Sequence, residues 1–338
     1  MTSSLTTPGL PPAGIDTYTL DLPHGISLSC RAAGERGRPV LVFLHGFPEA
    51  AFAWDALLLH FSKQEHGGYR CIAPNLRGFE HSSAPADPAL YRAKHLVADI
   101  AALIAIESPG APLKALIAHD WGGAVAWNLA NQKPALIERL VIINSPHPGT
   151  FLRELQKPKQ QDHSAYMNFL IRPDAEQLLA QDDFRRLWEF FTYMGAGAER
   201  FGWLTDAVKA QYRAVWSLGL TGGCNYYRAS PLRPPRPEDP AAAAITLPRE
   251  MLTVNLPTLV LWGMQDTALP PELIEGLDDY LPQLKLVKVE DATHWIVHEQ
   301  PELVAREIGA FLLSKNCSEF QYTDGSPSGR SLKRLCTQ

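Results

Sequence analysis

Short apolar runs alternate along the first half of the chain with longer stretches in which apolar positions recur every three or four residues. The apolar runs, typical of strands buried on both faces of a parallel sheet, occupy residues 39–44, 69–72, 113–118 and 140–143. The helical periodicity between them covers residues 51–61, 94–106 and 122–131. Ahead of these, residues 17–21 and 26–31 alternate like a hairpin around a turn at 23–25. This succession predicts a mostly parallel sheet with helices on both faces.

The alternation stops after residue 145. Residues 146–250 show helical patterns at 182–194 and 202–218, a proline-rich stretch and no strand-like run. The alternation then resumes, with strands expected at 258–262 and 284–289 and helices at 271–280 and 301–313. A helical block inserted in such a sheet usually covers the carboxyl ends of the strands, where ligands bind. We therefore expect this block to be a lid.

The predicted organisation is an α/β protein in five segments. They are a flexible lead-in (1–15), the first part of the core (16–145), the helical lid (146–250), the second part of the core (251–314) and a tail (315–338). The tail is polar and contains Gly, Ser and Pro, which predicts disorder. No internal repeat is visible.

Composition narrows the function classes. The 338 residues are 46% apolar and carry 31 Lys+Arg against 36 Asp+Glu, a net charge of −5. The apolar share excludes a disordered chain. The slightly negative net charge lacks the excess of basic residues that is typical of a nucleic-acid-binding protein. The longest unbroken apolar run, 100–106, is far shorter than the roughly 20 residues that a membrane-spanning helix needs.

The N-terminus and the cysteines favour a cytoplasmic protein. The first residues have neither a basic region nor an apolar stretch, so no signal peptide is predicted. The five cysteines are scattered and odd in number, and none stands in a metal-binding spacing. We expect them to be reduced thiols, and we expect no metal. Neither a coiled-coil heptad nor an obvious interface patch fixes the oligomeric state, and a homodimer stays open.

The strongest chemical signal is the run Ala-His-Asp-Trp-Gly-Gly at 118–123, between a predicted strand and a predicted helix. A nucleophile elbow needs small residues two before and two and three after the reactive residue, because the turn is too tight for larger side chains. Ala118, Gly122 and Gly123 meet this requirement around Asp120. An aspartate in this place attacks carbon and forms an alkyl ester. The alternative is that Asp120 is only a helix N-cap.

The run His-Gly-Phe-Pro-Glu at 45–49 follows the strand that ends at residue 44. Its tight turn can aim the Phe47 N–H at the elbow, where it would form an oxyanion hole together with the Trp121 N–H. The alternative is a plain strand-to-helix turn in which His45 hydrogen-bonds the backbone. Both interpretations can hold together.

An ester on Asp120 must be hydrolysed, which calls for a general base. His294 follows the last predicted strand, where the chain order nucleophile, acid, histidine puts the base. Its rivals are His119, within the elbow, and His298, on the following helix.

The acid that orients the base is expected to be Asp266, just beyond the strand at 258–262. The alternatives are Asp278, Asp279 and Asp291. The other place where such an acid can stand, the end of the strand at 140–143, carries Asn144 and Ser145. Because no acid stands there, Asp266 is favoured as the residue that orients the base.

Opening a strained C–O ring requires a donor to the emerging alkoxide, and a phenol held in an apolar pocket is a suitable acid. Tyr166 and Tyr227 are the candidates. Nothing in the residue pattern alone separates them from the remaining candidates, Tyr91, Tyr193, Tyr212 and Tyr226.

Several of these motifs together resemble a known family. They are HGFPE at 45–49, RGF at 77–79, HDWGG at 119–123, NYYR at 225–228, Asp266 and THW at 293–295. On these motifs, residues 17 to 313 resemble the epoxide hydrolases of the α/β-hydrolase superfamily. The family's lid tyrosine seven residues before a proline matches Tyr166 and Pro173, and its second tyrosine falls on Tyr227. The chain departs from the family pattern at Glu80, where a second glycine is usual, and at 171–172.

The resemblance implies an enzyme that needs no cofactor and converts an epoxide and water into a vicinal diol. Asp120 would attack a ring carbon while Tyr166 and Tyr227 hold the oxygen. His294, oriented by Asp266, would then activate water, and the Phe47 and Trp121 amides would stabilise the oxyanion.

Two classes of dehalogenase, a serine esterase and a non-enzymatic binding protein each share part of this pattern. A haloalkane dehalogenase shares the aspartate elbow but needs a second halide donor, and Phe47 has no side-chain N–H. A fluoroacetate-type dehalogenase has arginines near the elbow, where this chain has Trp121 and Ala124. A hydrolase-fold binding protein would have lost its triad, whose positions are all filled here. A serine esterase fails because residue 120 is not serine.

Overall fold

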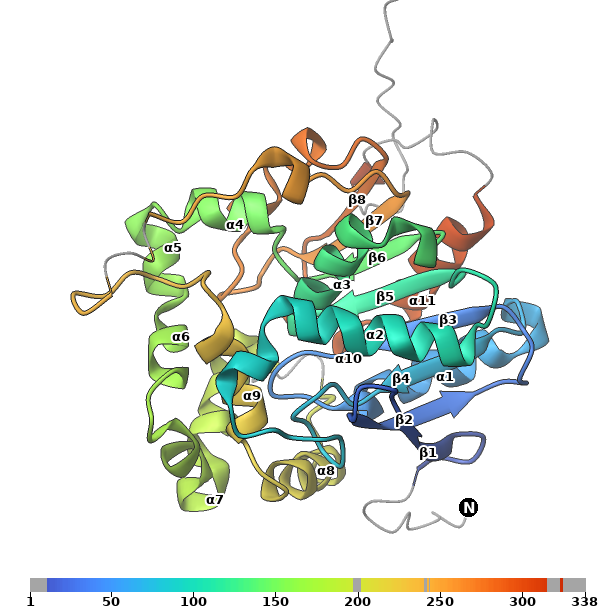
Figure 1. The fold of residues 1–338 in the computed structure, drawn as a ribbon, viewed down its shortest axis with the longest axis horizontal. Helices are drawn as coiled ribbons and strands as arrows, with labels where there is room; N and C mark the ends of the chain where they lie inside the picture. The colour runs from blue at the N-terminus through green and yellow to red at the C-terminus, as the bar shows by residue number, and fades with distance from the viewer. Residues whose placement is uncertain (1–10, 197–201, 240–241, 243, 315–322, 325–338) are drawn as a thin grey trace, which may run out of the picture.

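The computed structural model describes residues 11–196, 202–239, 242, 244–314 and 323–324 (Figure 1). At its centre lies a nine-stranded sheet in the order β1-β2-β4-β3-β5-β6-β7-β8-β9. The strands are β1 (Asp16–Asp21), β2 (Ser27–Ala33), β3 (Val40–Leu44), β4 (Arg70–Pro74), β5 (Ala115–His119), β6 (Leu140–Ile143), β7 (Thr258–Gly263), β8 (Leu284–Val289) and β9 (Thr323–Asp324). The β1–β2 and β2–β4 pairs are antiparallel, and all pairs from β4 to β9 are parallel. The predicted α/β architecture with a mostly parallel sheet is confirmed.

Helices cover both faces of the sheet because its central strands are apolar on both sides. Every residue of β3, β4, β5, β6 and β7 is buried. One core cluster joins these strands to α2 (Ala93–Glu107), α3 (Asp120–Gln132) and the inserted block. A second cluster joins the opposite face to α1 (Asp55–Ser62), α10 (Ile296–Glu299) and α11 (Pro301–Leu313). The 3₁₀ turns around the core are η1 (Ala51–Trp54), η2 (Gln64–His66), η3 (Pro88–Tyr91) and η4 (Pro134–Leu136).

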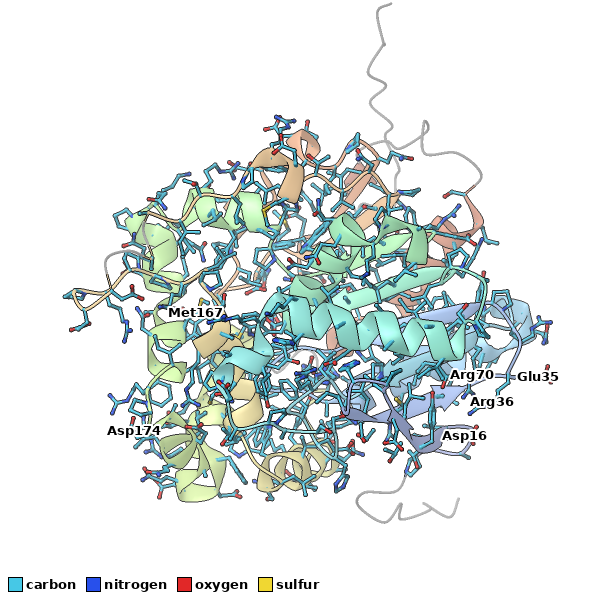
Figure 2. All side chains as sticks on the ribbon, in the orientation of Figure 1. Asp16, Glu35, Arg36, Arg70, Met167 and Asp174 are labelled. Carbon is cyan, nitrogen blue, oxygen red and sulfur yellow. The ribbon has the colours of Figure 1, made fainter. Side chains whose placement is uncertain are left out.

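The inserted block between β6 and β7 has helices and helical turns as its regular elements, with a non-helical stretch after residue 229 that holds one isolated bridge between Arg236 and Asp239. Its elements are α4 (Pro148–Glu154), α5 (Pro158–His163), α6 (Ala165–Leu170), α7 (Ala175–Phe191), the π-turn η5 (Thr192–Ala196), α8 (Asp206–Ser217), α9 (Thr221–Ala229) and η7 (Arg249–Met251). These helices gather at one end of the sheet (Figure 1). Figure 2 shows Met167 and Asp174 of the block on the opposite side of the molecule from Asp16, Glu35 and Arg36 of the hairpin region. The hairpin edge is therefore remote from α6 and from the start of α7.

Some expected helices differ in the structure. The helix predicted at 271–280 is wrong: the segment forms two 3₁₀ turns, η8 (Pro271–Ile274) and η9 (Leu277–Asp279). Gly276 between them has φ of +71°, a left-handed conformation that no continuous helix contains. The helix expected from 202 begins at Asp206, because the Thr205 hydroxyl accepts the Val208 N–H and caps it there.

Most of the lead-in and the tail lies outside the described residues. Cys30, Cys71 and Cys224 are buried free thiols, and Cys317 and Cys336 lie outside the described residues. In the described part of the chain, no helix is both long and apolar enough to cross a bilayer. Among the same described residues, no group of three His, Cys, Asp or Glu side chains is placed so that it could hold a metal ion.

Candidate active site

The elbow predicted at 118–123 is a sharp turn between β5 and α3. Asp120 has φ of +49°, a left-handed conformation that is strained for a residue with a side chain and is concentrated at functional sites. Small residues make the turn possible, since a Cβ on Gly123 would lie 2.3 Å from Cβ of Ser145 and one on Gly122 2.4 Å from the Leu44 carbonyl oxygen. The Ser145 hydroxyl donates to the Asp120 carbonyl at 2.7 Å. The turn is thus held by close packing and by a hydrogen bond.

The Asp120 carboxylate faces both the predicted amide donor and the predicted base. Its Oδ1 accepts the Phe47 N–H at 2.8 Å, and its Oδ2 lies 4.0 Å from Nε2 of His294. A Cβ on Gly46 would lie 2.2 Å from Oδ1, so only glycine lets the loop approach this closely. Trp121 follows in the first turn of α3, where backbone N–H groups have no partner within the helix.

His294 and Asp266 form a buried pair. Nδ1 of His294 lies 2.6 Å from Oδ2 of Asp266, and both side chains are fully buried. Because a carboxylate only accepts, Nδ1 carries the proton and Nε2 is left as the basic nitrogen that faces Asp120. Nε2 has no hydrogen-bond partner among the described residues. Burial alone would lower the pKa of His294, but Asp266, Asp120 and Glu49 outweigh it, so that the pKa is raised above its ordinary value.

Asp266 is itself held by four donors. Its Oδ1 accepts the N–H groups of Ala268 at 3.0 Å and Leu269 at 2.9 Å, and its Oδ2 accepts Nδ2 of Asn144 at 2.8 Å as well as His294. Asn144 in turn accepts the Gly263 N–H at 2.8 Å. The carboxylate is therefore fixed in one orientation. The sequence marks Asn144 only as a position without an acid, whereas in the structure its side chain holds Asp266 in place.

The rival residues have other partners. His119 contacts Glu49 through Nδ1 and the His294 carbonyl oxygen through Nε2 at 2.9 Å. His298 contacts Glu49 at 2.5 Å. Asp291 accepts from Gln300 at 2.9 Å. The last two rivals, Asp278 and Asp279, lie in the turn η9 and are exposed.

A cavity of about 240 Å³ lies between α3 and the inserted block, and Asp120, Tyr166 and Tyr227 line it. Burial raises the pKa of both phenols well above the ordinary value. The nearby Asp120 carboxylate adds to both shifts, because a second negative charge beside it is unfavourable. Both hydroxyls therefore stay protonated and can donate into the cavity.

The other tyrosines are engaged elsewhere. Tyr226 also lines the cavity, but its hydroxyl donates to the Arg77 carbonyl at 3.0 Å. Tyr91 donates to the Pro85 carbonyl at 2.9 Å. The hydroxyl of Tyr212 donates to Glu49 at 2.8 Å, and Tyr193 is 50% exposed. The contacts separate candidates that the residue pattern could not.

Glu49 is a buried charge to which the sequence assigned no role. Its carboxylate contacts His298, Tyr212 and His119. Burial alone would raise the pKa of Glu49, but the two histidines outweigh it and hold the pKa well below its ordinary value. The signal was available, because Glu49 ends the HGFPE run, yet its partners come from three distant segments.

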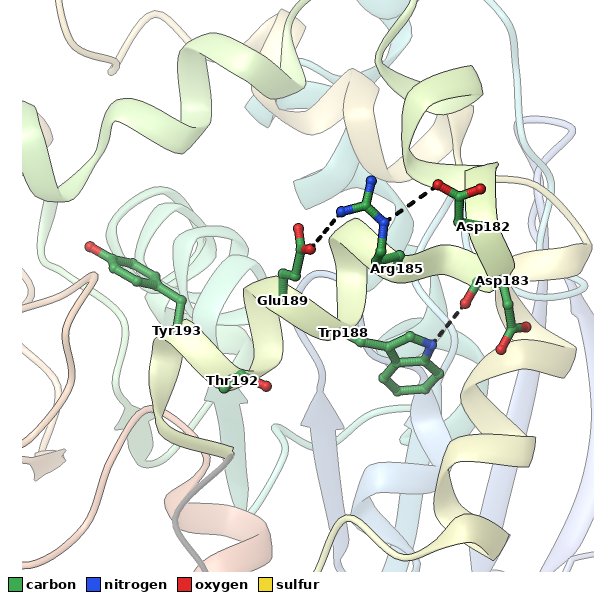
Figure 3. Close-up of a pocket in the computed structure, with 7 residues that line it drawn as sticks. All are labelled: Asp182, Asp183, Arg185, Trp188, Glu189, Thr192 and Tyr193. Carbon is green, nitrogen blue, oxygen red and sulfur yellow. Dashed lines mark hydrogen bonds and ion pairs between the residues drawn. The ribbon is translucent and has the colours of Figure 1, made fainter.

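A second hollow, of about 580 Å³, lies along α7 (Figure 3). Its charged groups are all paired: Arg185 donates to Glu189 at 2.8 Å and to Asp182 at 3.4 Å, and Asp183 accepts from Arg213 of α8. The Trp188 indole N–H donates to the Asp183 carbonyl at 2.9 Å. These pairings leave the cavity beside Asp120 as the stronger candidate for chemistry.

Comparison with known proteins gives matches over most of the chain. The sequence model of the alpha/beta hydrolase fold family matches residues 39–301. Mouse epoxide hydrolase 4 is 34% identical over 308 residues, which are 89% of this chain and 80% of that protein. The crystal structure of Bacillus megaterium epoxide hydrolase with an inhibitor superposes with a TM-score of 0.77 at 28% identity, covering 88% of this chain and 100% of that one. One of the novel epoxide hydrolases from hot-environment metagenomes gives a TM-score of 0.73 at 34% identity, covering 88% and 98%.

Proposed function

Because the chain belongs to the alpha/beta hydrolase family and, within it, to the epoxide hydrolases, we propose that it converts an epoxide into a vicinal diol through an ester on Asp120. The observation that supports this most is that a carboxylate and two protonated phenols line one cavity, with a buried histidine 4.0 Å from the carboxylate.

The first step forms the ester. Asp120 attacks a ring carbon in line, the C–O bond breaks, and its electron pair moves to the oxygen. One of the phenols, Tyr166 or Tyr227, gives that oxygen a proton, and the other stabilises the charge by a hydrogen bond. These donors accelerate the step because they act on charge that develops only in the transition state.

The second step hydrolyses the ester. Nε2 of His294 takes a proton from water, and the hydroxide attacks the carboxyl carbon of Asp120. The N–H groups of Phe47 and Trp121 stabilise the tetrahedral oxyanion. The diol oxygen leaves with the proton of His294, and the proton of the released carboxylic acid restores the phenol.

The inserted block supplies the phenols, and we assign it the role of a lid on this basis. Tyr166 stands on α6 and Tyr227 on α9, whereas Asp120, Asp266 and His294 all belong to segments of the core. Nucleophile and ring-opening donors thus face each other across the cavity.

Single-turnover hydrolysis of styrene oxide in heavy-oxygen water tests the proposal. We expect the first-turnover diol to carry ordinary oxygen and the label to appear in the peptide that contains Asp120. The Asp120→Ala variant should keep its fold and lose turnover. Label that goes straight into the diol would mean direct attack by water. Halide release from bromoalkanes, with no diol from any epoxide, would identify a dehalogenase.

A further inference from the structure

One face of α3 is half-buried and borders the cavity, whereas the other positions of the helix are buried up to Ala130 and Gln132 at its end is exposed. The half-buried positions of α3 are Asp120, Trp121, Ala124, Asn128 and Asn131. They recur every three or four residues and so share one face. All but Asn131 line the cavity. With a rise of 1.5 Å per residue, Asn128 stands about 12 Å from Asp120 along the helix axis. The cavity is therefore a channel that runs from the nucleophile along α3.

The opposite wall and the outer end of this channel come from the segments that follow α9. Leu232, Leu247 and Met251 line it, and Met251 is 58% exposed, which places the mouth of the channel there. The Asn131 amide donates to the carbonyl oxygens of Glu250 at 2.9 Å and Thr253 at 2.8 Å. These two bonds fasten the mouth to α3, so the channel has a fixed length.

The lining restricts what the channel can hold. Among the described residues that line it, Asp120 is the one charged side chain, and most of the others are apolar. A volume of about 240 Å³ lies just below the range of roughly 300–1,000 Å³ that is usual for ligand pockets. That space suits a small, slender neutral molecule.

We propose that this channel selects terminal epoxides on an unbranched apolar chain, an inference that rests on the proposed function. The ring lies at Asp120 and the chain follows α3 toward Met251. Ala124 sets the width, because its methyl group is the smallest side chain on the exposed face of α3. Asn128 is the last residue of α3 that lines the channel, and its polar amide, which donates to the Ala124 carbonyl at 2.8 Å, interrupts the apolar lining of that face.

The wild-type protein is tested first with 1,2-epoxybutane, 1,2-epoxyhexane, 1,2-epoxyoctane and 1,2-epoxydecane. Each methylene that moves from water into the channel should raise kcat/KM, by up to about fourfold. The increase should stop once the chain passes Asn128. A value of kcat/KM that does not depend on chain length would overturn the proposal while leaving epoxide hydrolysis in place.

Two substitutions should change chain-length selectivity in opposite directions. Ala124→Phe narrows the channel and should lower the ratio of kcat/KM for 1,2-epoxyoctane to that for 1,2-epoxybutane at least tenfold. Asn128→Leu extends the apolar lining and should raise the same ratio. Ala105→Phe, the same exchange as at Ala124 but on the exposed face of α2, is the matched control and should leave the ratio unchanged.

Thermal unfolding shows whether each variant is folded. If Ala124→Phe does not fold, the ratio of kcat/KM measured for Asn128→Leu tests the proposal. Unchanged ratios in folded variants overturn the assignment of the channel. If no epoxide, styrene oxide included, yields a diol with the wild-type protein, the proposed function fails and the inference fails with it.

Discussion

Replacing Asp266 by asparagine should trap the proposed ester on Asp120. Oδ1 of Asp266 accepts two backbone N–H groups, so the asparagine oxygen should occupy this position. Its NH₂ group then faces Nδ1 of His294, which must accept instead of donate. The imidazole proton moves to Nε2, and the nitrogen that faces Asp120 stops being a base.

The expected loss of rate follows from the hydrogen bond between His294 and Asp266 that the substitution weakens. A charge-assisted hydrogen bond such as the 2.6 Å contact between Nδ1 and Oδ2 contributes about 1.5–3 kcal/mol, or about 10- to 150-fold in rate. The inverted tautomer adds to this loss, because the equivalent exchange in a serine protease triad lowers kcat by about 10⁴. We expect hydrolysis of the ester to slow by about 10³–10⁴-fold. Ester formation, which relies on Asp120 and the two phenols, should remain fast.

Rapid-quench kinetics with intact-mass analysis measures both steps. The Asp266→Asn variant should gain the mass of one epoxide within the first turnover and lose it slowly. Asp278→Asn, the same exchange at an exposed aspartate, serves as the control and should turn over like the wild type. The assignment of His294 and Asp266 is refuted if the folded Asp266→Asn variant hydrolyses epoxide at the wild-type rate. A slow variant that accumulates no ester would show that the pair acts on ring opening.

Three further predictions concern the phenols, the base and the elbow. Tyr227→Phe should slow ester formation more than Tyr226→Phe, because the Tyr226 hydroxyl already donates to the backbone; equal effects in rapid-quench assays would contradict this. Hydrolysis of the preformed ester should slow as the pH falls through the pKa of His294, which the Asp266 carboxylate raises, since only the neutral ring is a base, and Asp266→Asn should move that midpoint to lower pH. A midpoint that stays in place would exclude the carboxylate as the cause. Gly123→Ala should destabilise the fold by about 1–3 kcal/mol in thermal unfolding, because its Cβ would meet Ser145, and adding Ser145→Gly should recover part of the loss.

The regular elements of the core were predictable because burial on both faces leaves a continuous apolar run. β6, β8 and α11 begin and end where the pattern predicts. The segment 271–280 misled the prediction, because its apolar spacing resembles a helix while Gly276 takes a left-handed conformation. The spacing of apolar residues indicates which side chains are buried, but it does not determine the backbone conformation between them.

The candidate site was predictable where its chemistry is local in sequence. The elbow around Asp120 needs small neighbours, and those can be counted in a sequence. The contacts of Asn144 and Glu49 could not be foreseen, because their partners are distant along the chain and meet only in the fold. The choice of Tyr166 and Tyr227 came from family resemblance, and their surroundings in the cavity supply a physical reason for it.

The direct pairing of β6 with β7 has a consequence for how this protein can diversify. The inserted block leaves the sheet after β6 and returns just before β7, and these neighbouring strands are in register from Leu140↔Thr258 to Ile143↔Leu261. Asn144 and Asp266 meet beyond the carboxyl ends of the two strands, so the block begins beside the acid and returns at the opposite edge of the sheet, where Pro257 leads into β7. Changes in the length or sequence of the block can reshape the substrate channel while the acid and the base keep their places. Selectivity can in this way evolve within the block, as long as Tyr166 and Tyr227 are kept, while the core retains the nucleophile, the acid and the base.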